Sequence, residues 1–142
     1  MIDTSTLTQV ASIIAGFGAT ALTFRIQREI EMNKLGERNW IPWADRLLIA
    51  AIIACLLVVV LVMLFGTRIP VITILSRGLC ASSASMLGGW IFGILAHYRL
   101  ILSKNPKNEK RDNPEPAEKV IVWITIIISV VVFLITFILE EA

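Results

Sequence analysis

The sequence has little charge for its length. Asp, Glu, Lys and Arg make up 17% of its 142 residues, whereas 56% are hydrophobic; soluble globular domains carry about 25% charged residues. A soluble chain this small must cover a large surface with polar atoms, and this composition does not supply them. The composition therefore excludes the soluble, disordered and collagen-like classes and indicates a membrane protein.

Residues that carry chemistry are also scarce. The chain has two cysteines and one histidine, and its long apolar runs hold no Asp or Glu apart from Asp45 at the edge of one run. Two cysteines do not make a disulfide framework. The sequence also lacks paired carboxylates, a zinc-spaced His/Cys set and a phosphate-binding glycine loop. We therefore expect no enzymatic activity, no cofactor and no metal site.

What the chain has instead is four apolar runs, each long enough to cross a hydrocarbon core, which takes about 20 helical residues. Their bounds are Leu7–Phe24, Pro42–Phe65, Val71–Leu95 and Val120–Leu139. The first helix is expected to continue to residue 35 and the third to residue 102, and a cytoplasmic loop is expected over 103–118. The runs do not alternate in polarity, which favours helices over barrel strands. The sequence predicts an all-α fold: a single membrane domain, 1–142, forming a four-transmembrane-helix bundle.

The basic residues are distributed unevenly along the chain. Eleven of the thirteen lie in two segments, 25–46 and 99–119. Cytoplasmic loops are enriched in Lys and Arg, so both segments are expected in the cytoplasm. The N-terminus and the C-terminus are then both outside. We expect the protein in the cell inner (plasma) membrane.

Small and hydroxylated residues recur at helical spacing in the first and third runs. In the first run they are Ser5, Thr8, Ser12, Gly16, Ala19 and Thr23. In the third run they are Gly78, Ser82, Ser85, Gly89 and Gly93. Small residues let helices approach closely in lipid, so each stripe predicts a packing interface or a hydroxyl-lined path. We expect the first and third helices to form the inner pair of the bundle, with the second and fourth facing lipid.

Two further features constrain how the helices are arranged. The connection Thr67–Pro70 is so short that the second and third helices are expected to be antiparallel neighbours. In the fourth helix, one face is richer in hydroxyl groups than the rest and is expected to point inward. Its members are Thr125, Ser129, Val132 and Thr136.

Three polar residues lie at or inside the predicted membrane boundaries. Arg77 is roughly 9 Å from the start of the third helix, and it either reaches back to the interface or lines an external vestibule. Asp45 lies in the first turn of the second helix, where the helix dipole favours an acid. His97, beside Tyr98 and Arg99, ends the third run. Asp45 and His97 are interpreted as interfacial anchors.

The basic residues of the two charged segments form a candidate docking surface for a soluble cytoplasmic protein. Arg25 and Glu29, spaced i, i+4, favour continuation of the first helix into that surface. Acidic residues dilute the positive charge, so nucleic acid is not expected as a partner. The candidate docking residues are Arg25, Arg28, Lys34, Arg38, Lys104, Lys107, Lys110 and Arg111.

These patterns favour a non-enzymatic, oligomeric pore or channel-like membrane protein, with the two stripes at its interior and Arg77 near the external mouth. The small-residue surface exceeds what one chain can bury, which indicates a homo-oligomer surrounded by membrane lipid. The alternative is a membrane anchor or scaffold that recruits a soluble partner. A small transporter is a weaker alternative, because no acid within the membrane is available to couple protons or sodium.

Overall fold

The computed structural model describes residues 4–34, 42–66, 69–98 and 115–141. These residues form four helices, and each is long and apolar enough to cross a membrane. The helices are α1 (Thr4–Lys34), α2 (Asp45–Phe65), α3 (Pro70–His97) and α4 (Glu115–Glu141). The expected all-helical, four-helix architecture is confirmed for this part of the chain.

The helix boundaries lie within three residues of the expected ones, except at the end of α3 and the start of α4. Helix α1 does continue past the first apolar run, to Lys34. Helix α4 begins at Glu115, five residues before the expected Val120, so the end of the predicted loop 103–118 is helical. Pro116 explains this start, because proline fits the first turn of a helix, where its missing N–H is harmless. Helix α3 ends at His97 and Tyr98 lies in a turn, while residues 99–102 of the expected continuation lie outside the described residues.

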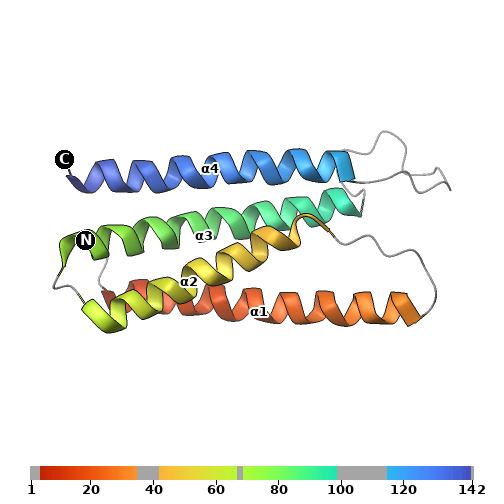
Figure 1. The fold of residues 1–142 in the computed structure, drawn as a ribbon, viewed down its shortest axis with the longest axis horizontal. Coiled ribbons are helices and arrows are strands. Elements are labelled where there is room, and N and C mark those ends of the chain that lie inside the picture. Colours follow the sequence, from red (N-terminus) through yellow and green to blue (C-terminus); the bar gives the residue numbers. More distant parts are fainter. Residues whose placement is uncertain (1–3, 35–41, 67–68, 99–114, 142) are drawn as a thin grey trace.

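Helix α3 is the central element of the bundle. It packs against α4 on one side and α2 on the other, while α1 packs mainly against α2 and touches α3 over a shorter stretch. Figure 1 shows α4 and α1 at opposite edges, with the first turn of α1 and the last turn of α4 at the same end. The expected inner pair of first and third helices is therefore wrong.

The reason lies in what the small residues contact. Three of the four tight glycines accommodate a larger side chain of a neighbouring helix, whereas the fourth, Gly93, faces Ala44. A Cβ at Gly18 would lie 2.7 Å from Ile52 of α2, and one at Gly78 would lie 2.9 Å from Phe133 of α4. The helices rich in small residues thus pair with the helices rich in bulky ones, because the interdigitation of large and small side chains fills space densely.

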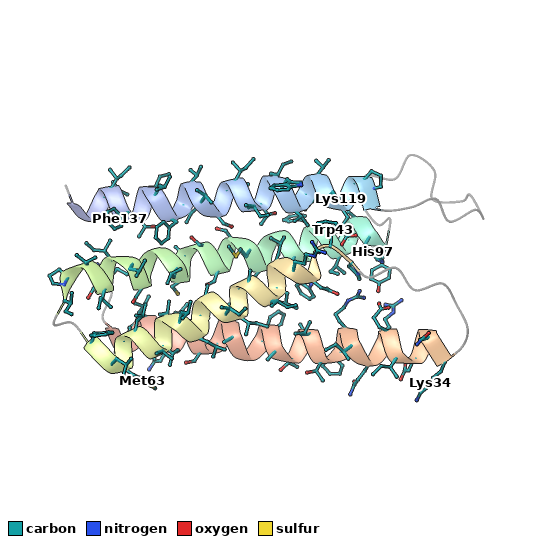
Figure 2. The ribbon with its side chains drawn as sticks, in the orientation of Figure 1. Lys34, Trp43, Met63, His97, Lys119 and Phe137 are labelled. Atoms are coloured by element: carbon teal, nitrogen blue, oxygen red, sulfur yellow. The ribbon has the colours of Figure 1, made fainter. Side chains whose placement is uncertain are left out.

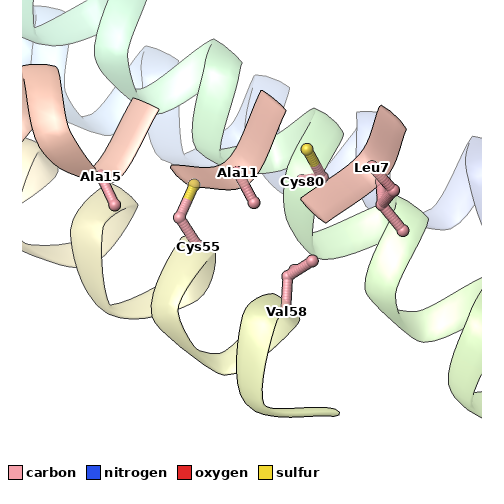
Figure 3. Packing of buried hydrophobic residues seen from close by; sticks show 6 residues of the cluster. All are labelled: Leu7, Ala11, Ala15, Cys55, Val58 and Cys80. Carbon is pink, nitrogen blue, oxygen red and sulfur yellow. The ribbon is translucent and has the colours of Figure 1, made fainter. Parts of the chain in front are cut away.

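Helix α2 also has an inward face, contrary to its expected exposure to lipid. Figure 3 shows the apolar cluster in which α1, α2 and α3 meet. Its buried members are Leu7, Ala11, Ala15, Cys55, Val58 and Cys80. The alanines let α2 approach α1 closely, so aliphatic and thiol side chains pack without a polar stripe.

The other two packing predictions are confirmed. Helix α2 ends at Gly66, which has a φ of 56° and donates its N–H to Val62 O at 2.8 Å. Helix α3 runs antiparallel against α2 (Figure 1). On α4, Thr125 and Ser129 are buried, so the hydroxyl-bearing face does point inward.

Candidate functional site

A cluster of ionic and aromatic side chains joins the helices at the end of the bundle where α3 finishes and α4 begins. Its first part surrounds Arg25, which is on the inward face of α1 and only 8% exposed. Arg25 Nη2 lies 3.3 Å from Glu29 Oε1, one turn further along α1. Its Nε lies 3.6 Å from Asp45 Oδ1, at the start of α2, and its Nη1 donates to the hydroxyl of Tyr98. One guanidinium group thus ties α1 to α2 and α3.

Asp45 is shared between two helices besides its own. The indole N–H of Trp90, on α3, donates to the same Oδ1 atom at 3.1 Å. Arg28, one turn beyond Arg25 on α1, places its guanidinium carbon 4.5 Å from the centre of the Tyr98 ring. A cation over an aromatic face is attracted by the electrons of the ring. These contacts hold α1 against the start of α2, the last turns of α3 and Tyr98.

The second part of the cluster surrounds Glu118, which is 1% exposed. Its Oε1 accepts a hydrogen bond from the backbone N–H of Ala44 at 2.7 Å, and its Oε2 lies 3.1 Å from His97 Nδ1. The His97 ring meets the neighbouring Tyr98 ring edge to face, with 5.3 Å between their centres. This contact joins the Glu118 part to the Arg25 part. We call Arg25, Glu29, Asp45, Trp90, His97, Tyr98 and Glu118 the polar cluster.

A third group of contacts lies beside the polar cluster. The guanidinium carbon of Arg46, on α2, is 3.9 Å from the Trp43 ring centre, and Lys119 Nζ, on α4, is 4.6 Å from it. Figure 2 shows Trp43, His97 and Lys119 at the same end of the bundle, with Lys34 further out on α1. The rings and cations gathered here are typical of a membrane–water boundary.

The carboxylates of the polar cluster hold the helices together. Both oxygens of Glu118 have partners on other elements, and Asp45 Oδ1 has two. A buried carboxylate is stable only when its charge and lone pairs are matched in this way. Within residues 4–34, 42–66, 69–98 and 115–141, no group of three or more His, Cys, Asp or Glu side chains could hold a metal ion.

The polar cluster also corrects the interpretation of two residues as simple anchors. Asp45 and His97 do lie at helix ends, as expected, but each also pairs across the bundle. Sequence reasoning missed Glu118 and Trp90 altogether. A signal for Glu118 was present: it lies seven residues before Thr125, so two helical turns place it on the same inward face.

The α3 stripe, defined as Gly78, Ser82, Ser85, Gly89 and Gly93, lies within the folded chain and is filled by its neighbours. A Cβ at Gly89 would lie 2.1 Å from Thr125 of α4, and one at Gly93 would lie 2.6 Å from Ala44. The Ser82 hydroxyl donates to Ser129 O at 2.9 Å, a second tie between α3 and α4. In a single chain this stripe is a packing surface against α4 and the start of α2.

The α1 stripe, defined as Ser5, Thr8, Ser12, Gly16, Ala19 and Thr23, has the opposite placement. Its members are exposed, apart from Thr8, which is half-buried. The inward face of α1 consists instead of Leu7, Ala11, Ala15 and Gly18. The Thr23 hydroxyl donates to Ala19 O at 2.9 Å, so its donor is satisfied within the helix. The two stripes therefore do not meet in one chain.

The remaining candidate residues are spread over the structure. Arg77 is half-buried on α3, and Arg28 and Lys34 are exposed on α1. Arg25 is buried in the polar cluster, so it is part of the fold and not of a docking surface. Arg38, Lys104, Lys107, Lys110 and Arg111 lie outside the described residues.

Comparison of the whole chain with known proteins gives no relative: no family model, no curated protein and no solved structure matches it.

Proposed function

We propose that this protein is a non-enzymatic, oligomeric, channel-like integral membrane protein whose polar path runs between copies of the chain along α1. The single observation that carries the proposal is the outward placement of the α1 stripe. Hydroxyl groups and small side chains on a helix long enough to cross a membrane gain little from contact with lipid tails. Contact with the α1 helices of other copies is more favourable for these groups than contact with lipid.

The packing of α3 supports a path between copies rather than through one chain. Thr125 of α4 packs over Gly89, and Phe133 of α4 packs over Gly78. The α3 stripe is therefore already covered by α4 of the same chain. Helix α1 has α2 as its main neighbour and lies at one edge of the bundle, where a second chain can approach it (Figure 1).

The polar cluster supports the proposed orientation. Its ionic pairs, together with Trp43, Arg46 and Lys119, form the charged end of the bundle, and we assign this end to the cytoplasmic face of an inner membrane. Both termini are then outside. A reporter fused after Ala142 and active only outside the cytoplasm is expected to be active, and activity of a cytoplasmic reporter there would reverse the assignment.

The test of the path is cysteine accessibility in the reconstituted protein. Ser12→Cys and Thr23→Cys place a thiol on the α1 stripe, while Ile13→Cys places one on an exposed apolar position of the same helix. A charged, water-soluble thiol reagent is expected to reduce ion conductance of both stripe variants and to leave Ile13→Cys unchanged. Unmodified protein is the background, because Cys55 and Cys80 are buried.

Two results would contradict the proposal. The first is the absence of conductance in the unmodified reconstituted protein. The second is equal modification of Ser12→Cys and Ile13→Cys, which would remove the distinction between the stripe and the rest of the helix surface. If conductance is absent, the anchor hypothesis is favoured, since Arg28 and Lys34 are exposed in the last two turns of α1. Charge reversal at these two residues is then expected to abolish capture of the soluble partner.

A further inference from the structure

Helix α1 presents two exposed faces of different character within its membrane-crossing part. The α1 stripe is one of them. The other, here called the bulky face, consists of the large exposed side chains Ile13, Phe17 and Phe24. Large apolar side chains suit lipid tails, whereas small ones suit the close approach of another helix. The exposed surface of α1 therefore has one face suited to lipid and another suited to a second helix.

The polarity of both faces is inverted toward the protruding end of α1. Counting three residues on from Thr23 and then four more, the line of the α1 stripe continues to Ile26 and Ile30, which are 52% and 50% exposed. Counting on in the same way from Phe24, the line of the bulky face continues to Gln27 and Glu31, which are polar and exposed. The face that was small becomes aliphatic, and the face that was apolar becomes polar.

The inversion occurs where α1 leaves the bundle. Arg28 still contacts Tyr98, which directly follows α3. Helix α1 nevertheless runs on to Lys34, and Figure 1 shows it extending past the ends of the other three helices. Its 31 residues span about 46 Å, against a hydrocarbon core of about 30 Å. Ile30 therefore lies beyond the part of α1 that the bundle and the lipid tails can cover.

This pattern indicates which kind of partner covers the α1 stripe and its continuation. Within lipid, helices associate through small residues that permit close contact, but in water they associate by burying aliphatic side chains. A lipid-covered surface would show the reverse order, apolar inside the membrane and polar outside it. A soluble protein would cover Ile26 and Ile30 but not the small residues that lead to them. The partner must be a helix that crosses the membrane and also protrudes from it.

The chain itself supplies such a helix. We propose that copies of this protein associate through parallel, in-register contact of their α1 helices, along the α1 stripe and its continuation at Ile26 and Ile30. Parallel alignment brings each isoleucine level with its equivalent in the partner.

This inference rests on the proposed function only in taking the protein as an oligomer around α1, and it is tested without measuring conductance. Ile30→Cys and its neighbour Glu31→Cys are reconstituted separately in liposomes and oxidised with a mild catalyst. Ile30→Cys is expected to form a disulfide-linked dimer that is lost on reduction, while Glu31→Cys remains monomeric. Unmodified protein controls for the two buried native cysteines.

The proposed contact between α1 helices is here called the seam. A second measurement examines the part of the seam that the α1 stripe forms. A Cβ added at Gly16 would meet no heavy atom within 4 Å in the single chain, so Gly16→Leu is expected to fold normally. It is expected to reduce energy transfer between labelled copies in liposomes at least severalfold. Phe17→Leu, on the bulky face, is the matched control and is expected to leave the energy transfer unchanged.

Each outcome has a defined meaning. Absence of the Ile30→Cys dimer, or equal dimer yields from Ile30→Cys and Glu31→Cys, would overturn the proposed seam. Unchanged energy transfer in Gly16→Leu would overturn its membrane part. A specific Ile30→Cys dimer in a protein without conductance would reject the channel and keep the seam. Conductance that is blocked in Ser12→Cys, without an Ile30→Cys dimer, would keep the channel and overturn the seam.

Discussion

The carboxylate of Glu118 lies 2.7 Å from the backbone nitrogen of Ala44, so the first turn of α4 is hydrogen-bonded to the residue that precedes α2. The same carboxylate holds His97 through its other oxygen at 3.1 Å. These contacts join segments that are 74 and 21 residues away in the sequence. The carboxylate of Glu118 thereby ties one end of α4 both to α3 and to the residue before α2.

Substitution Glu118→Ala is expected to destabilise the protein by about 1–3 kcal/mol, because it leaves a buried N–H without its acceptor. Glu118→Gln retains an acceptor oxygen and is expected to cost less. Thermal unfolding in detergent, followed by circular dichroism, measures both effects. Glu31→Ala is the matched control, since Glu31 is an exposed glutamate on α1. Equal midpoints for Glu118→Ala and Glu31→Ala would show that the contact contributes nothing.

Loss of the buried guanidinium of Arg25 is expected to have a larger effect. Arg25→Met is expected to cost roughly 3 kcal/mol or more, since it leaves Asp45 with its charge partly buried and only Trp90 as a donor. In Arg25→Met/Asp45→Asn the second substitution is expected to restore part of the loss. Equilibrium unfolding of the single and double variants measures this coupling. Additive effects of the two substitutions would argue against an energetically important pair.

Much of the fold follows from local sequence features. The apolar runs locate the four helices, the short Thr67–Pro70 connection makes α2 and α3 neighbours, and the spacing of Thr125 and Ser129 identifies the inward face of α4. Each of these depends on residues close together in the chain. Hydrophobic periodicity and turn length express such local constraints directly.

Helix pairing and the polar cluster could not be predicted in the same way. A stripe of small residues shows that a helix is approached closely, but the partner can be a small-residue helix, a bulky one or another copy. Asp45, His97 and Glu118 come from three separate segments, and each alone resembles an interfacial anchor. Their joint role depends on the relative rotation of the helices, which only tertiary packing determines.

Neighbouring glycines on α3 provide a test of that packing. A Cβ at Gly89 would lie 2.1 Å from Thr125, whereas one at Gly88 would meet nothing within 4 Å. Gly89→Ala is therefore expected to destabilise the protein by about 1–3 kcal/mol through overpacking. Gly88→Ala is expected to be neutral or slightly stabilising, because alanine favours helix more than glycine does.

Adding Thr125→Ala to Gly89→Ala separates the clash from any change in the helix itself. The added substitution removes the Thr125 Cγ2 and Oγ1 atoms, the two closest to the new methyl group, and leaves the Cβ at 2.6 Å. Partial recovery of stability is expected. Unfolding midpoints of equal value for Gly88→Ala and Gly89→Ala would contradict the close packing of α3 against α4.

Substitution of Arg77 tests whether this residue lies near a channel mouth or only anchors α3 in the membrane. It is half-buried on α3, toward the end of the bundle away from the polar cluster. If copies surround a path, positive charges near its outer mouth favour anions. Arg77→Ala is then expected to lower the anion-to-cation permeability ratio severalfold, and Arg77→Lys to preserve it. Lys34→Ala, at the opposite end, controls for a general loss of positive charge. Reversal potentials measured in asymmetric salt give this ratio. If Arg77 is only an anchor, Arg77→Ala changes the unfolding midpoint or membrane insertion while the permeability ratio stays constant.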